Sequence, residues 1–124
     1  MFRAEAKQHI AEELARGAAA REAGFEGRAR VCARRAAGAA VREYLELRGA
    51  PNLMQGGSAY DLLVYMRDLA ESGMGPAGPG IRQRVDYLLV RVNEAYALPV
   101  DVNLLAEASG LVDDLESLLS EGSR

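Results

Sequence analysis

Apolar residues recur along this chain at intervals of three and four, the spacing that places them on one face of an α-helix. The first stripe, for example, is Phe2, Ala6, Ile10 and Leu14. Five amphipathic helices joined by short loops predict an all-α fold, an antiparallel up-and-down bundle in one domain spanning residues 1–124. The predicted helices cover residues 2–16 (extending as far as 22), 28–48, 58–71, 81–94 and 101–120.

Residues typical of helix ends bound these stretches. Gly49 is a natural C-terminal stop for the second helix, and Ser58 with Asp61 has the spacing of a capping box for the third. Asp101 is the predicted N-cap of the fifth helix. Residues 50–57 and the Gly/Pro-rich residues 72–80 read as connections. The inner face of the second helix is mostly small, which suits a central helix or a dimer seam: Ala33, Ala36, Ala37, Ala40, Tyr44 and Leu47.

Composition agrees with the helical reading and narrows the functional classes. Ala, Leu and Arg, which are good helix formers, dominate the chain, and it has no Thr or Trp. The net charge of −3 and a pI of about 5.2 argue against indiscriminate nucleic-acid binding. No apolar run approaches the ~18 residues of a membrane span, and charged residues precede any apolar run at the N-terminus. We therefore expect a soluble, cytoplasmic protein without a membrane partner.

The scarcity of His and Cys limits the chemistry that the chain can perform. His9 is the single histidine and Cys32 the single cysteine, so a Ser/His/Asp triad, a zinc site and a Glu-x-x-His di-iron site are not expected. His9 reads as a surface partner of Glu5, and Cys32 as a small core residue. Residues 73–80 lack the Gly-Lys-Ser/Thr of a phosphate loop. No catalytic residue, metal or cofactor is predicted.

Charge is unevenly distributed between the second and the fifth helix. Residues 28–48 hold six Arg and two Glu, whereas residues 101–124 hold six acidic residues and one Arg. Arg28, Arg35 and Arg42 lie seven residues apart and so share one stripe of the second helix. They could form a face that contacts the phosphates of a nucleotide or RNA. Alternatively they pair with the acidic fifth helix, within the subunit or across a dimer, and the negative net charge favours this reading.

The order of these features resembles the HEPN (higher eukaryotes and prokaryotes nucleotide-binding) domains, which are helical bundles and commonly dimers. Residues 27–37, GRARVCARRAA, resemble the family's Ala-rich helix, and residues 58–63 resemble a helix start that often carries His-Asp-Leu. The family's ribonucleases use an Arg, then four to six intervening residues, then a His, followed shortly by Val or Ile and Asp at the next helix. Arg91 and the pair Val100-Asp101 match that order, but the His position falls on Tyr96 or on no residue. Arg3 and His9 match the spacing only on the first helix, away from the family's location.

A phenol titrates near pH 10 and is a poor base at neutral pH, so the resemblance implies a non-catalytic member. We expect a HEPN-like binding or interaction module that forms a homodimer and contacts a nucleotide, RNA or a partner protein. The alternatives are a metal-independent ribonuclease of the same family that uses Arg91, and a purely structural helical dimer. The homodimer is expected because five apolar stripes are more than a chain of this size easily hides. The candidate contact residues are Arg91, Tyr96, Arg28, Arg35 and Arg42.

Overall fold

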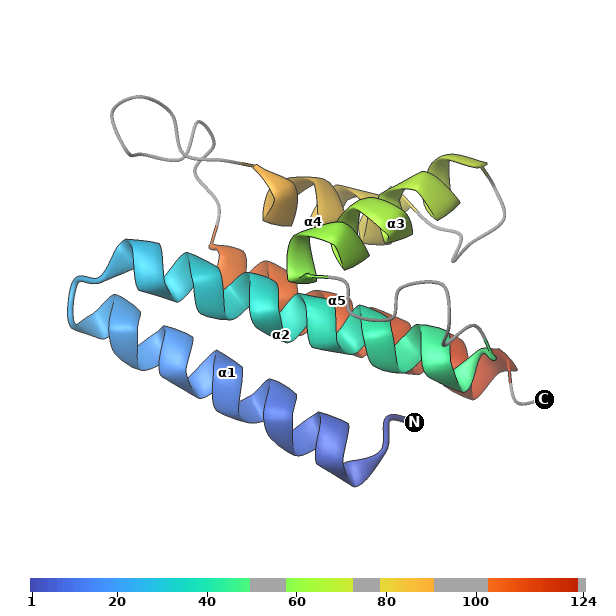
Figure 1. Ribbon diagram of the computed structural model, residues 1–124, viewed down its shortest axis with the longest axis horizontal. Coiled ribbons are helices and arrows are strands. Elements are labelled where there is room, and N and C mark those ends of the chain that lie inside the picture. The colour runs from blue at the N-terminus through green and yellow to red at the C-terminus, as the bar shows by residue number, and fades with distance from the viewer. Residues whose placement is uncertain (50–57, 73–78, 91–102, 123–124) are drawn as a thin grey trace.

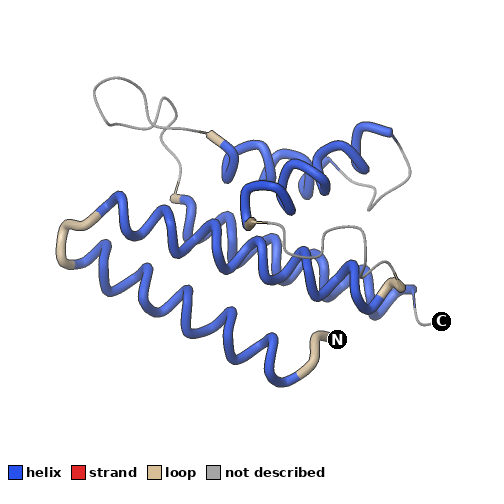
Figure 2. Tube along the Cα trace, viewed as in Figure 1, coloured by secondary structure: helices blue, strands red, loops and turns tan. Residues whose placement is uncertain are grey.

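The computed structural model describes residues 1–49, 58–72, 79–90 and 103–122, and within these ranges every regular element is a helix (Figures 1 and 2). This confirms the all-α bundle of five helices. Within the described ranges, no helix is long and apolar enough to cross a membrane. The helices are α1 (Ala4–Glu22), α2 (Glu26–Leu47), α3 (Ala59–Ser72), α4 (Pro79–Leu89) and α5 (Leu104–Gly122).

The helices form two layers around a central α2. The long helices α1 and α2 run antiparallel as a hairpin, and α5 lies along the opposite side of α2 (Figure 1). The shorter α3 and α4 pack against each other and lie across α2 and α5. One face of the α1–α2 hairpin therefore meets the start of α3, and this junction holds the candidate site.

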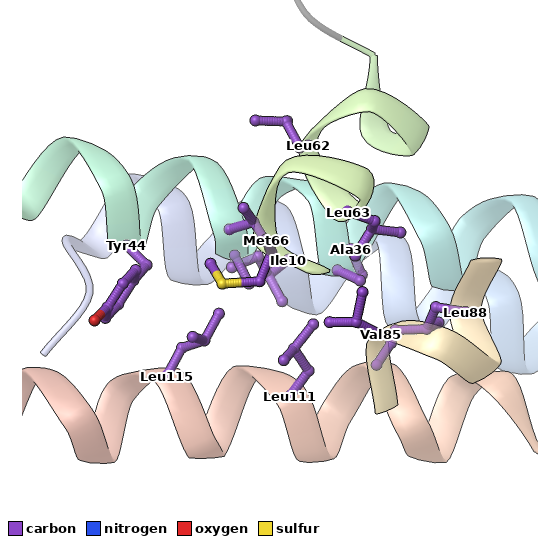
Figure 3. Close-up of a cluster of buried hydrophobic side chains, with 14 of the residues drawn as sticks. Ile10, Ala36, Tyr44, Leu62, Leu63, Met66, Val85, Leu88, Leu111 and Leu115 are labelled. Carbon is purple, nitrogen blue, oxygen red and sulfur yellow. The ribbon is translucent and has the colours of Figure 1, made fainter. Parts of the chain in front are cut away.

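A single cluster of buried apolar side chains joins all five helices. Ile10, Met66, Val85 and Leu111 come from α1, α3, α4 and α5 and point toward one another (Figure 3). The small residues of α2 let these neighbours approach its backbone closely. Of its predicted inner face only Leu47 is wrong, because it is the last residue of α2, where the helix has fewer neighbours, and it is 40% exposed. The buried residues of that face are Ala33, Ala36, Ala37, Ala40 and Tyr44.

The apolar faces that predict a homodimer thus pack largely against one another inside one chain. Fewer large apolar side chains remain exposed in the described ranges than the five apolar stripes suggest. They are Met1, Phe25, Val31, Leu47 and Tyr60. Homodimer formation stays a prediction.

Two glycines act where helices meet rather than where they end. Gly17 lies inside α1, which continues to Glu22, and a β-carbon at Gly17 would come within 2.5 Å of Leu105 Cδ2. The glycine leaves room for Leu105 of α5 beside α1, and α1 reaches Glu22, the longer of the two ends predicted for the first helix. Gly38 does the same for α2 and α3, because a β-carbon there would lie 2.7 Å from the Ala59 β-carbon.

The predicted capping residues are confirmed in part. The Asp61 N–H donates to Ser58 Oγ at 3.1 Å, and the Ser58 N–H donates to Asp61 Oδ2 at 3.4 Å, as in a capping box. Gly49 has φ +83° just after α2. Asn103 is the N-cap of the fifth helix, two residues after the predicted Asp101, because Asn103 Oδ1 accepts from the Leu105 and Ala106 N–H groups. Asp101 itself lies outside the described ranges.

The ends of α4 also differ from the sequence prediction. Pro79, expected in the connection between the third and fourth helices, is its first residue, a position that tolerates the missing N–H of proline. The helix ends at Leu89, where the carbonyls of its last turn are bound by an arginine of α2, as described below. Val90, predicted to be helical, follows the end of α4, and residues 91–94 of the predicted helix lie outside the described ranges.

Arg3 binds the N-terminal segment to the C-terminal end of α2. Its backbone N–H donates to Glu43 Oε2 at 2.7 Å, and its guanidinium pairs with Glu43 and Glu46. Glu43 is 4% exposed, a burial that the sequence pattern did not predict. The hydrogen bonds from Arg3 hold the pKa of Glu43 below its ordinary value, although burial acts in the opposite direction.

This arrangement predicts an acid-dependent contribution to stability. Because the pKa of Glu43 is lower in the folded than in the unfolded state, its ionised form stabilises the fold at pH values above the unfolded pKa of about 4.3. This stabilisation is lost as the pH falls through the folded pKa. We expect Glu43→Gln to lower the free energy of unfolding by about 1 kcal/mol at pH 7, since the exposed Arg3 is screened by solvent. Urea unfolding at pH 7 and pH 3 measures the difference, which should shrink at pH 3. A difference that is the same at both pH values would contradict it.

Candidate functional site

The predicted arginine stripe of α2 lies along the groove between α1 and α2. Arg35 and Arg42 line a pocket of about 420 Å³ together with His9 and Glu13 of α1 and the start of α3. We call this the His9 pocket. Arg28 and Arg35 line a second hollow of about 710 Å³, with Phe25 and Val31, which we call the Phe25 pocket. Arg35 belongs to both pockets, so they adjoin along one groove.

Helix periodicity brings these side chains together. His9, Glu13 and Arg16 follow one another at spacings of four and three, so they lie on one face of α1. Arg28, Arg35 and Arg42 repeat every seven residues on the facing side of α2. Because the two helices are antiparallel, the end of α1 that carries His9 meets the end of α2 that carries Arg42.

The start of α3 closes the His9 pocket. Ala59 and Leu62 line it, and Ala59 rests against Gly38 of α2. The N-terminal end of a helix carries a partial positive charge, which adds to the attraction of an anion here. Part of this charge is balanced by Asp61, whose carboxylate accepts the Ser58 N–H.

Among the described residues that line the His9 pocket, Glu13 is the one acidic side chain, and it is 4% exposed. Its Oε1 accepts a hydrogen bond from Arg16 Nη1 at 3.2 Å, whereas its buried Oε2 has no hydrogen-bond partner in the described ranges. A buried acceptor without a partner costs free energy. The burial of Glu13 does not follow from the sequence. His9 is exposed, as expected for a surface residue, but the sequence does not indicate that it lines the same pocket as Arg35.

Arg34, on a neighbouring stripe of α2, has a structural task. Its Nε donates to the Leu88 carbonyl at 2.7 Å and its Nη2 donates to the Val90 carbonyl. A cation that binds the last carbonyls of a helix is favourable because these groups carry the negative end of the helix dipole. Arg34 therefore caps α4, in contrast to Arg35, which lines the pockets.

The carboxylates of α5 have partners on α4. Arg84 pairs with Glu107 and with Asp114, each at 3.1 Å. One interpretation of the sequence is that the arginines of α2 pair with the acidic residues of the fifth helix. For Glu107 and Asp114 that expectation is wrong, because α4 lies between α3 and α5 and presents Arg84 to the acidic face.

The sequence-predicted contact residues are thus only partly placed. Arg28, Arg35 and Arg42 come together along one groove, while Arg91, Tyr96 and residues 73–78 of the predicted connection lie outside the described ranges. Cys32 is buried, as expected for a core residue. No group of three His, Cys, Asp or Glu side chains in the described ranges could hold a metal ion. Protein-family models, curated proteins and solved structures give no match to the chain.

Proposed function

We propose that this chain is a non-catalytic, HEPN-like helical binding module that holds the phosphate of a nucleotide or RNA in the His9 pocket. The observation that carries the proposal is the convergence of Arg35 and Arg42 on one pocket with His9. Guanidinium groups bind phosphate oxygens through charge-assisted, often bidentate hydrogen bonds. The N-terminal end of α3 at the same pocket adds to this preference for an anion.

Local charge supports the proposal despite the acidic whole. Residues 1–49 hold ten basic and seven acidic residues, a local charge of +3 in a chain of −3. The groove concentrates part of that positive charge, and the carboxylates of α5 are partly occupied by Arg84. Arg35 makes no hydrogen bond or ion pair with the described residues, so its guanidinium is available to a ligand.

Binding of a fluorescently labelled nucleotide and of a short single-stranded RNA tests the proposal. We expect Arg35→Ala and Arg42→Ala each to weaken binding about tenfold, because each removes charged hydrogen bonds worth about 1.4 kcal/mol. For the RNA, each substitution should also reduce the slope of log K against log salt by about 0.7. Fluorescence anisotropy at several salt concentrations measures both effects.

The matched control is Arg21→Ala, which removes an exposed arginine that pairs with Glu26 and lines neither pocket. This variant should bind as the wild type does. The absence of binding at low salt, or an equal loss in all three variants, would rule the proposal out. Cleavage of the RNA during the measurement would instead favour the ribonuclease alternative.

A further inference from the structure

The Phe25 pocket has an apolar surface that the core does not use. Phe25 is 56% exposed and Val31 is 44% exposed, although both lie beside the hairpin turn of α1 and α2. Small residues also line this pocket: Ala19 and Ala20 of α1, and Ala23, which follows α1. Large exposed apolar side chains beside a hollow of about 710 Å³ are typical of a binding surface.

The charged side chains that line this hollow in the described ranges are arginines, of which Arg16 is paired with Glu13. Arg16, Arg28 and Arg35 line it, and the described lining includes no carboxylate. Arg28 lies in the first turn of α2, where the positive end of the helix dipole disfavours a cation. Its guanidinium carbon lies 5.3 Å from the centroid of the Phe25 ring, a cation–π contact that orients the charge. This contact places the charge of Arg28 beside the exposed Phe25 ring at the hollow.

The spacing of the lining residues along α2 defines which kind of ligand would fit the Phe25 pocket. Arg28, Val31 and Arg35 stand at positions i, i+3 and i+7 of one helix, so the two charges are about 10.5 Å apart along its axis with an apolar residue between them. A helix in an apolar groove is bound through residues with the same periodicity. The complementary ligand is a helix that carries two carboxylates seven residues apart and an apolar residue between them.

We propose that the Phe25 pocket docks an acidic amphipathic helix of a partner protein. The carboxylates would pair with Arg28 and Arg35, and the apolar residue would pack on Phe25 and Val31. A second copy of this chain is a poor occupant. Its own helix with that spacing, α5, already uses Glu107 and Asp114 on Arg84, and Leu111 between them is completely buried.

The site is separate from the phosphate site proposed above, apart from the shared Arg35. Of these two pockets, Arg28, Phe25 and Val31 line the Phe25 pocket and not the His9 pocket, and Arg42 and His9 line the His9 pocket and not the Phe25 pocket. Substitutions at Arg28 and Val31 therefore test helix docking, and substitutions at Arg42 test phosphate binding. Either proposal can fail while the other holds.

The test uses a fluorescein-labelled helical peptide with Glu, Leu and Glu at positions i, i+4 and i+7. A second peptide of the same composition has the two Glu residues moved to opposite faces of the helix. We expect the full chain to bind the first peptide with a Kd on the order of micromolar and the second at least about tenfold more weakly. Arg28→Glu should weaken the binding of the first peptide about tenfold or more. Val31→Ser should also weaken its binding, although it changes no charge.

A charge exchange makes the assignment specific. A peptide with Lys in place of the Glu that faces Arg28 should bind Arg28→Glu more tightly than it binds the wild type. Arg82→Glu, which makes the same charge change on α4, is the control and should leave binding unchanged. Equal binding of both peptides, or an equal loss in Arg28→Glu and Arg82→Glu, would overturn the proposal. So would an RNA oligonucleotide that binds in an Arg28-dependent way while neither peptide binds.

Discussion

Replacing Leu111 by Ala should lower the free energy of unfolding by about 2–5 kcal/mol, the range for removal of a fully buried leucine side chain. Leu111 is completely buried on α5 and points into the cluster that Met66 and Val85 form from the other layer (Figure 3). The loss combines the transfer of the removed atoms with the cavity that remains, because the surrounding helices relax only partly. For a domain of this size that is a large part of the total stability.

Urea unfolding followed by far-ultraviolet circular dichroism measures this change. The matched control is Leu47→Ala, which removes the same atoms from a side chain that is 40% exposed at the end of α2. It should cost less than about 1 kcal/mol. Similar losses in the two variants would mean that the two leucines are equally buried in solution, contrary to the packing described above.

The second large effect on stability is expected for Gly38→Ala. Its sign should be opposite to that of the same substitution at other positions within a helix. Ala in place of Gly within a helix usually stabilises it, by about 0.5–1 kcal/mol. At Gly38 the added β-carbon would lie 2.7 Å from the β-carbon and 2.8 Å from the α-carbon of Ala59. Because a backbone atom cannot move aside as a side chain can, α3 must shift, and we expect Gly38→Ala to cost about 1–3 kcal/mol.

Gly27 provides the comparison within the same helix. It lies in the first turn of α2, and a β-carbon there would meet nothing within 4 Å. Gly27→Ala should therefore raise the midpoint of thermal unfolding while Gly38→Ala lowers it. A stabilised Gly38→Ala would show that α3 does not rest on α2 at this point. Because Ala59 also lines the His9 pocket, Gly38→Ala should weaken phosphate binding as well.

Local patterns were sufficient to predict most of the helices. The three- and four-residue periodicity predicts the buried faces of α3, α4 and α5, and the capping box at Ser58 and Asp61 forms as its spacing indicates. The errors lie at helix ends, where a glycine or a cap has two possible meanings. The sequence leaves the end of the first helix open between residues 16 and 22, and α1 continues past Gly17, which lies against Leu105 of α5, a residue distant in the sequence.

The sequence predicts only the part of the candidate site that α2 contributes. The seven-residue spacing of Arg28, Arg35 and Arg42 is visible in the sequence, because residues seven apart share a helix face. Nothing in the sequence indicates that His9 and Glu13 of another helix lie opposite them. A single histidine beside a glutamate has the same local pattern whether it faces solvent or a pocket.

The sequence by itself determined that this chain forms amphipathic helices and that one of them carries a stripe of arginines, since both depend on the periodicity of a single helix. Only the tertiary structure decided which arginine caps α4, which ones line the groove, and that Glu13 and Glu43 are buried. These outcomes depend on how the helices are placed beside one another. That placement follows from close approaches such as those at Gly17 and Gly38, which join residues far apart in the chain.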